Sequence, residues 1–322
     1  MKAPLSIVTG LVLLASSAQG AVTKFIVESR APYAQDAKFE TLYGHFEGAL
    51  DPADPHNRII TDIALAPRNA QGRVEYSATF RIVKPVDMAK ASGLLFYQVV
   101  NRGNGQPGYF PQGHVGVVSG WQGDLVERPN LQPIRVPVAR NRDGSALLGP
   151  AFARLIDIAA GTPSVAIIGN AGGEGGRNFA PATAVGARLI TTVSDTAAPV
   201  EVPRAEWALA DCSAKPFPGV PDLTKLCLKG GFDPKLSYML SFQAADPKVL
   251  GIGFAATRDL IAFLRYGARD AAGNANPLAG RLRWAVASGT SQSGNFLRSL
   301  VHLDFNASED GRIVFDGIRP LI

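Results

Sequence analysis

One segment near the end of this 322-residue chain restricts the local backbone more than any other. A mostly apolar run over 284–287 leads into the hexapeptide Gly289-Thr290-Ser291-Gln292-Ser293-Gly294. Apolar residues then recur at helical spacing, at Phe296, Leu297, Leu300 and Val301. This order predicts a strand, a sharp turn and a helix, and such a turn exposes the side chain at its centre. Ser291 is therefore the first candidate for a functional residue.

The turn predicts a nucleophilic serine because it needs small residues two positions before and two positions after the exposed side chain. Gly289 and Ser293 meet this requirement around Ser291. The backbone N–H of Gln292 would then face the oxyanion that develops on a carbonyl substrate, at the positive end of the helix. Ser293 is a competing nucleophile with less suitable neighbours, Ser291 and Asn295, and a turn with only a structural role is the other alternative.

The N-terminal part of the chain predicts antiparallel β structure. Residues 24–86 hold short β-like patterns separated by turn residues, and the clearest of these are 25–27, 59–63 and 74–80. We expect them to form an N-terminal β region over 21–90.

The remainder predicts a mostly parallel sheet, so the expected fold class is α/β, with an incomplete core over 91–322. Apolar runs at 94–100 and 115–119 end in polar, glycine-rich loops, which is typical of parallel strands buried on both faces. Helical periodicity over 253–266 ends at Gly267, a residue type common at helix C-termini.

A long insertion is expected between 127 and 248. The pattern weakens there into short strand candidates separated by Pro, Gly and Asn, at 134–138, 165–168 and 189–193. We expect this insertion to form a lid or a cap over the site.

The first 20 residues predict an export signal. Lys2 precedes an apolar stretch over 5–15, and Ala18-Gln19-Gly20 provides small residues for cleavage, so the mature protein should begin at Ala21. A membrane anchor is the alternative, but it needs about 20 apolar residues, and polar residues interrupt the run too early. No later stretch is long and apolar enough to span a bilayer. We expect a soluble periplasmic or extracellular protein.

Export favours a disulfide between Cys212 and Cys227, because close cysteine pairs usually oxidise outside the cytoplasm. Closing this loop would stabilise the fold by about 3 kcal/mol. Two cysteines without a nearby His provide too few ligands for a metal site, and two unpaired buried thiols are the alternative.

The charge pattern indicates no nucleic-acid partner. The 32 Lys and Arg residues exceed the 27 Asp and Glu residues only slightly, and they form no block of like charge. We expect no metal and no cofactor.

Motifs spread over most of the chain suggest a family. They are the hexapeptide around Ser291, Phe305-Asn306-x-x-Glu309-Asp310-x-x-Arg312-x-Val314-Phe315-Asp316-Gly317, Asp51-Pro52-Ala53-Asp54-Pro55, Ala66-Pro67-Arg68-Asn69-Ala70, Asn101-Arg102-Gly103-Asn104, Gly120-Trp121-Gln122-Gly123-Asp124 and Gly253-Phe254-Ala255-Ala256-Thr257-Arg258-Asp259. Together they resemble a group of bacterial secreted α/β-hydrolase-domain proteins. The resemblance implies a serine hydrolase that cleaves a small-molecule carboxylic ester through an acyl-enzyme on Ser291.

In the α/β-hydrolase fold a second oxyanion donor comes from the loop after the third strand. By position, the N–H of Gly103 or Asn104 would supply it, although Gly103 has the alternative role of only permitting the turn. Trp121 and Asp124 follow the next strand and would lie at the rim of the cleft. Trp121 either lines a substrate pocket or serves only in packing.

A serine nucleophile also needs a base, normally a His that an acid orients, and the α/β-hydrolase order is Ser, acid, His. His302 lies about 16 Å along the helix from Ser291 and is too far to serve. Three aspartates follow too soon to be the acid: Asp304, Asp310 and Asp316. The other histidines precede the nucleophile and would require a non-standard order: His45, His56 and His114. We expect one more strand at 313–315 and the acid and His beyond Ile322, so that the chain as given would be inactive.

Two other functions compete with ester hydrolysis. Gly103-x-Gly105-x-x-Gly108 matches a dinucleotide fingerprint with Asp124 downstream, but Pro107 and Pro111 stand where the phosphate-facing helix would run. A non-catalytic binding module on a hydrolase scaffold is the second alternative.

Overall fold

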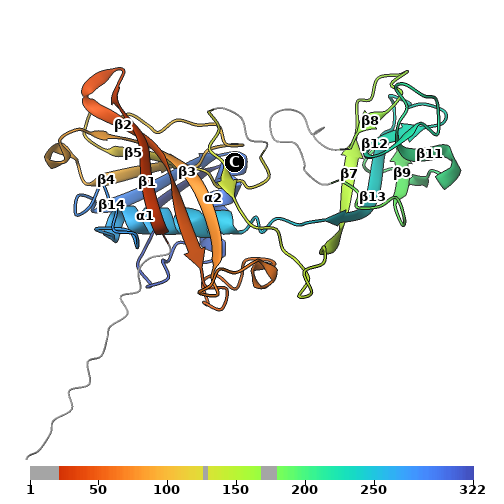
Figure 1. Ribbon diagram of the computed structural model, residues 1–322. Coiled ribbons are helices and arrows are strands. Elements are labelled where there is room, and N and C mark those ends of the chain that lie inside the picture. The colour runs from red at the N-terminus through yellow and green to blue at the C-terminus, as the bar shows by residue number, and fades with distance from the viewer. Residues whose placement is uncertain (1–21, 126–129, 168–179) are drawn as a thin grey trace, which may run out of the picture.

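The computed structural model describes residues 22–125, 130–167 and 180–322, which form two bodies that stand apart in Figure 1. The smaller body spans 148–245. Two segments, 136–147 and 246–251, join it to the larger body and contribute Ala139 and Val249 to the core of that body. The expected export signal over 1–20 lies outside the described residues.

The larger body is built on one eight-stranded sheet. Its order is β1 (Val22–Tyr33), β2 (Asp36–Leu50), β3 (Val74–Pro85), β5 (Val115–Ser119), β4 (Leu94–Gln98), β14 (Trp284–Thr290) and β15 (Gly317–Leu321), with β6 (Ile134–Arg135) paired to β3. Neighbours from β1 to β5 are antiparallel, and neighbours from β5 to β15 are parallel. The carboxyl ends of β5, β4 and β14 therefore lie along one edge of the sheet, the carboxyl edge.

Two α-helices pack on this sheet. Helix α1 (Ile252–Tyr266) contacts β1, β2 and β3, and helix α2 (Gln292–His302) contacts β14 and β15. Apolar side chains of both helices join the strands in a single large core. Short 3₁₀ turns occur at Ile63–Leu65, Met88–Lys90 and Arg204–Glu206. In the parts of the chain that the structure describes, no helix has the length and hydropathy to cross a membrane.

The smaller body consists of two antiparallel sheets with a separate core. One sheet has the order β10 (Val200–Glu201), β9 (Arg188–Thr192), β13 (Ser237–Ala245) and β7 (Leu148–Leu155), and the other has the order β11 (Trp207–Asp211), β12 (Val220–Leu228) and β8 (Val165–Ala166). Along β13, the buried side chains alternate with more exposed ones, at Tyr238, Leu240 and Phe242, as expected for a sheet with one solvated face. This body lies within the range expected as an insertion, and its role as a lid or cap stays a prediction.

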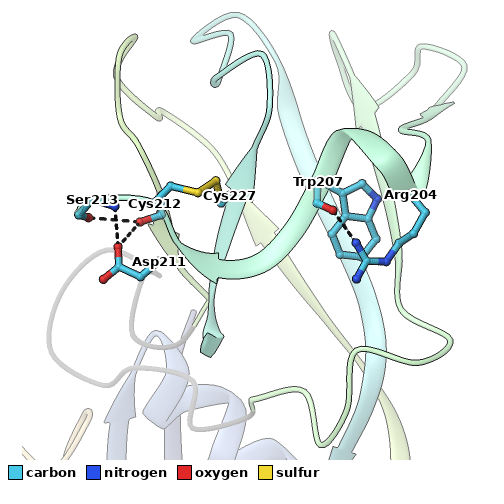
Figure 2. The surroundings of a disulfide bond; sticks show 7 residues. Arg204, Trp207, Asp211, Cys212, Ser213 and Cys227 are labelled. Atoms are coloured by element: carbon cyan, nitrogen blue, oxygen red, sulfur yellow. Dashed lines mark hydrogen bonds between the residues drawn. A yellow bond between two sulfur atoms is a disulfide. The ribbon is translucent and has the colours of Figure 1, made fainter. Parts of the chain in front are cut away.

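The expected disulfide is confirmed, since Cys212 and Cys227 are bonded to each other. Figure 2 shows the bridge beside the end of β11, where Asp211 accepts a hydrogen bond from the backbone N–H of Ser213. Cys227 lies on β12, so the disulfide ties the end of β11 to its neighbouring strand.

The predicted fold class is wrong. The described residues are 40% strand and 12% helix, with two α-helices and largely antiparallel sheets, unlike an α/β-hydrolase with its many helices. The reason lies in the connections. The segment between β4 and β5 contains Pro107, Gly108 and Pro111, which oppose the helix that a parallel crossover usually carries. The smaller body pairs its strands as antiparallel neighbours, so it needs no crossover helices at all.

Two local strand predictions are also wrong. Residues 59–63 form turns that lead into the first 3₁₀ segment, because Asp62 adopts a left-handed φ of 61° that breaks an extended run. The last strand runs over Gly317–Leu321 rather than 313–315. Val314 and Phe315 are buried in the core as part of an irregular segment, and the Val314 N–H donates to the carbonyl of Asn306.

Candidate functional site

Ser291 lies at the carboxyl edge in a backbone conformation that few residues other than glycine adopt. It immediately follows β14 and is the N-cap of α2, with φ 58° and ψ −123°. A positive φ combined with this ψ lies outside the left-handed helical region and matches the position that glycine takes in a type II′ turn. Backbone strain of this kind costs about 1–3 kcal/mol and persists only where the surrounding structure enforces it.

Two hydrogen bonds and two close backbone contacts enforce this conformation. The Ser291 N–H donates to the carbonyl of Leu321 at 2.7 Å, and the Ser291 carbonyl accepts from the Asn295 N–H at 3.0 Å. A Cβ on Gly289 would lie 2.4 Å from the Ser293 carbonyl oxygen, and one on Gly294 would lie 2.3 Å from the Leu321 carbonyl oxygen. Both positions exclude a side chain, so the tight turn depends on these glycines.

The exposed Ser291 side chain sits beside unpaired helix donors. The first three N–H groups of α2, from Gln292 to Gly294, have no partner within the helix, as is general for helix N-termini. The Ser291 side chain makes no capping hydrogen bond that would occupy them. The Gln292 N–H, which the sequence predicts as an oxyanion donor, belongs to the residue after Ser291 and makes no hydrogen bond to a described residue.

Strand register brings the loop after β4 to the same edge. Gln98 pairs with Ser288, and the Val99 N–H donates to the Ser288 carbonyl at 2.9 Å, so Asn101 and Ser291 each lie three residues past paired positions. The Gly103 N–H makes no hydrogen bond to any described residue, whereas the Asn104 N–H donates to the Asn101 carbonyl at 2.9 Å. Of the two predicted second donors, Gly103 is the one whose N–H is not engaged in the turn.

This loop is a tight turn with two left-handed residues. Arg102 has a φ of 50° and Gly103 has a φ of 75°, as the central residues of a type I′ turn do. Gly103 also packs closely, because a Cβ there would lie 2.7 Å from the side chain of Leu125. Gly103 therefore permits the turn, and its N–H donates to no residue in the described part of the chain.

Trp121 stands at the carboxyl edge beyond β5 and is half-buried. Its indole N–H donates to the Val100 carbonyl at 2.6 Å, and its ring lies 4.4 Å from that of Phe296 on α2. These contacts explain its position by packing. Asp124, the other predicted pocket residue, is half-buried in the loop that follows.

The described histidines make contacts away from Ser291. His45 lies 2.6 Å from Glu28, His56 lies 2.9 Å from Asp54, and His114 lies 2.7 Å from the Ser92 hydroxyl. His302 is the exposed last residue of α2, at the opposite end of the helix from Ser291. The aspartate closest in sequence to β15, Asp316, pairs with Arg265 at 2.9 Å. None of these groups orients the Ser291 hydroxyl in the described part of the chain.

A buried ionic network on α1 is a feature that the sequence analysis missed. Arg258 is fully buried, pairs with Asp259 at 2.7 Å and with Glu309 at 3.2 Å, and donates to Asn57 at 2.9 Å. Tyr76 on β3 donates to the other oxygen of Asp259 at 3.0 Å. Two adjacent charges inside a largely apolar helix, Arg258 and Asp259, were the available signal, since buried charges are normally paired.

Burial shifts the acids of this network. It raises the pKa of Asp259, and burial together with the nearby Asp259 carboxylate raises the pKa of Glu309. A pocket of about 210 Å³ opens beside the network and is lined by residues that include Asp259, Tyr266, Glu309 and Arg312. This pocket lies away from the carboxyl edge and does not include Ser291.

No protein-family model, curated protein or solved structure matches this chain. Among the described residues, no group of three or more His, Cys, Asp or Glu side chains is placed to hold a metal ion. At the carboxyl edge the structure places the Ser291 hydroxyl beside the first turn of α2, and the register of β4 and β14 brings the Gly103 loop to the same edge.

Proposed function

We propose that this chain carries the nucleophile of an exported serine hydrolase that cleaves carboxylic esters. The observation that supports this most directly is the strained backbone of Ser291 at the junction of β14 and α2. Strained residues cluster at active sites, where the surrounding structure holds a reactive group in place. The bond between Cys212 and Cys227 supports an oxidising compartment.

The proposed reaction proceeds through an acyl-enzyme. The Ser291 Oγ attacks the carbonyl carbon of the ester, and its proton passes to a general base as the C–O bond forms. The oxyanion accepts hydrogen bonds from the Gln292 N–H and the Gly103 N–H. Collapse of this intermediate expels the alcohol, which takes up the proton, and water then releases the acid and restores Ser291. The described histidines contact other residues, so the proposal names no base.

The test uses the longest open reading frame that contains this sequence. A fluorophosphonate probe should label that protein at Ser291, as located by mass spectrometry of the labelled peptide. Ser291→Ala should abolish labelling and lower the hydrolysis of 4-nitrophenyl acetate by at least about 10³-fold, because the acyl-enzyme can no longer form. Ser299→Ala, within the same helix, is the matched control and should retain both properties.

Two results would argue against this function. Labelling at another residue, or an active Ser291→Ala variant, would remove Ser291 from the reaction. A correctly folded full-length protein that neither reacts with the probe nor cleaves any ester would favour the alternative of a non-catalytic binding module.

A further inference from the structure

Buried polar atoms without partners gather at the carboxyl edge. In the described residues, five buried side-chain atoms make no hydrogen bond: Gln122 Oε1, Gln132 Nε2, Gln292 Oε1, Ser293 Oγ and Arg265 Nε. The first four belong to segments of the carboxyl edge. Only Arg265 lies at the opposite edge, where its guanidinium donates to the carbonyls of Ile313 and Val314. Ser291 lies at the same edge as these four atoms, and folded proteins leave few such atoms unpaired.

Two buried glutamines follow β5 in the chain, and other parts of the edge hold one of them, Gln132. Gln132 is fully buried; its N–H donates to the Gly103 carbonyl at 2.9 Å, and its Oε1 accepts from Thr79 Oγ1 at 3.0 Å, which leaves the amide nitrogen unpaired. Gln122 is 6% exposed and lies three residues beyond the end of β5. The Gln132 side chain is therefore positioned by the fold, and each of the two glutamines has one buried side-chain atom without a partner.

The other two residues directly follow the proposed nucleophile. Gln292 and Ser293 occupy the first two positions of α2, and Ser293 is only 1% exposed. Their side chains leave Oε1 and Oγ unpaired, next to backbone N–H groups that are also free of intrahelical partners. Hydrogen-bonding capacity thus remains beside Ser291 after the internal contacts of the turn have been made.

The chemistry of these atoms indicates what would satisfy them. The carbonyl oxygens of Gln122 and Gln292 only accept, the amide nitrogen of Gln132 only donates, and the Ser293 hydroxyl does both. A hydroxyl group donates and accepts, so it can pair with atoms of either kind, whereas a carboxylate only accepts. A plain alkyl chain would leave all four atoms unpaired.

We propose that the carboxyl edge around Ser291 contains a polar subsite that binds a hydroxyl group close to the scissile carbonyl. The inference rests on the proposed ester hydrolysis and names its substrate class, which is esters of hydroxylated acids rather than of plain alkyl acids. A site built to bond a substrate hydroxyl discriminates against the analogue that lacks it, because the buried polar groups of the site are then left unpaired.

The test compares two substrates of nearly equal size with the protein from the longest reading frame. The kcat/KM for 4-nitrophenyl 3-hydroxybutyrate should exceed that for 4-nitrophenyl butyrate by about tenfold or more. Gln122→Leu and Gln132→Leu should lower this ratio toward one, with folding verified by thermal unfolding. Gln71→Leu, at an exposed turn, is the control that should keep the ratio of the parent protein.

Equal kcat/KM values for the two esters in the parent protein would overturn the subsite, whatever the variants do. Failure to cleave either ester would count against the proposed function instead, and a binding measurement would then decide the subsite. By NMR titration, Ser291→Ala protein should bind ethyl 3-hydroxybutyrate at least about tenfold more tightly than ethyl butyrate. Equal binding, with ordered waters on the four atoms in a crystal structure, would overturn the inference.

Discussion

At the scale of single residues, Ser291 and its neighbouring glycines conflict with local preference. The other positive-φ residues that are not glycine include Asn130 and four aspartates, and their short polar side chains tolerate the left-handed region. Ser291 is neither Asn nor Asp, and its ψ of −123° lies outside the left-handed region. The turn therefore stores strain at a residue that is exposed beside helix N–H groups without intrahelical partners.

Replacing the strained residue by glycine should stabilise the protein. Glycine adopts the φ and ψ of Ser291 without strain, and after its larger unfolded-state entropy is subtracted, Ser291→Gly should raise the free energy of unfolding by about 1 kcal/mol. Urea unfolding measures this change. Ser299→Gly, in the middle of α2, should do the opposite and cost about 0.5 kcal/mol. A destabilised Ser291→Gly protein would show that the conformation carries no strain.

The close approach at Gly289 should make this position intolerant of any side chain. Gly289→Ala places a methyl group against the Ser293 carbonyl, and the required shift should lower the free energy of unfolding by about 1–3 kcal/mol. Gly149→Ala is the control, because its added methyl group would meet no atom within 4 Å. Equal unfolding midpoints in denaturant for the two variants would be inconsistent with the tight turn.

At the scale of elements, the buried network of Arg258 ties α1 to two segments far away in sequence. Asn57 belongs to the loop between β2 and β3, and Glu309 follows α2, so the guanidinium joins three parts of the larger body. Breaking such a pair leaves an uncompensated buried charge, which is why these contacts hold the elements in a single arrangement.

The pH dependence of stability should reveal the cost of burying Glu309. Its pKa is raised by burial and by Asp259, so the folded state binds the proton more tightly than the unfolded state. The contribution of Glu309 to the free energy of unfolding is therefore fully present below its ordinary pKa of 4.5. This contribution is lost as pH rises through the pKa of the folded state. Glu309→Gln resembles the protonated form and does not lose this contribution. In urea unfolding, the free energy of unfolding of the variant minus that of the parent should therefore increase between about pH 4 and pH 7.

Asp211 provides a control of opposite sign. Its hydrogen bond from Lys225 lowers its pKa, so its stabilising contribution is present above the ordinary value of 3.8 and is lost at lower pH. Relative to the parent, Asp211→Asn should therefore lose stability as pH rises through this range. Parallel pH profiles for the two variants would rule out the assigned shifts.

At the scale of the whole molecule, the chain divides its apolar residues between two principal cores. The larger core joins the eight-stranded sheet to both α-helices, and the second core fills the space between the two sheets of the smaller body. The two cores share no residue, and the bodies stand apart in Figure 1. Bodies with separate cores commonly unfold as separate units.

Removal of the disulfide should therefore affect one body only. Cys212 and Cys227 are 15 residues apart, and opening this loop by the double change Cys212→Ser and Cys227→Ser should cost about 3 kcal/mol. Calorimetry should show two unfolding transitions, of which the variant lowers one. Hydrogen exchange with mass spectrometry should assign the lowered transition to residues 148–245. A single transition, or an equal shift of both, would contradict independent cores.

Local patterns predicted the elements around the candidate site, and tertiary contacts decided what surrounds them. The turn at Ser291, helix α2 and the apolar strands before Gly103 and Trp121 could be predicted because each depends on the spacing of neighbouring residues. The cysteine pair was predictable for the same reason, since both cysteines lie in one short stretch of sequence.

The sequence by itself therefore determined where an exposed serine follows a strand, because sterics and helical periodicity act over a few residues. Only the tertiary structure decided the fold class. The same apolar or alternating sequence patterns occur in antiparallel and in parallel strands, and the strand that each one pairs with lies far away in the sequence. The Ser291 conformation depends on the Leu321 carbonyl, and Arg258 depends on Asn57 and Glu309. Contacts over such separations leave no periodic signal in the sequence, so the strain at Ser291 and the buried charges became visible only in the folded chain.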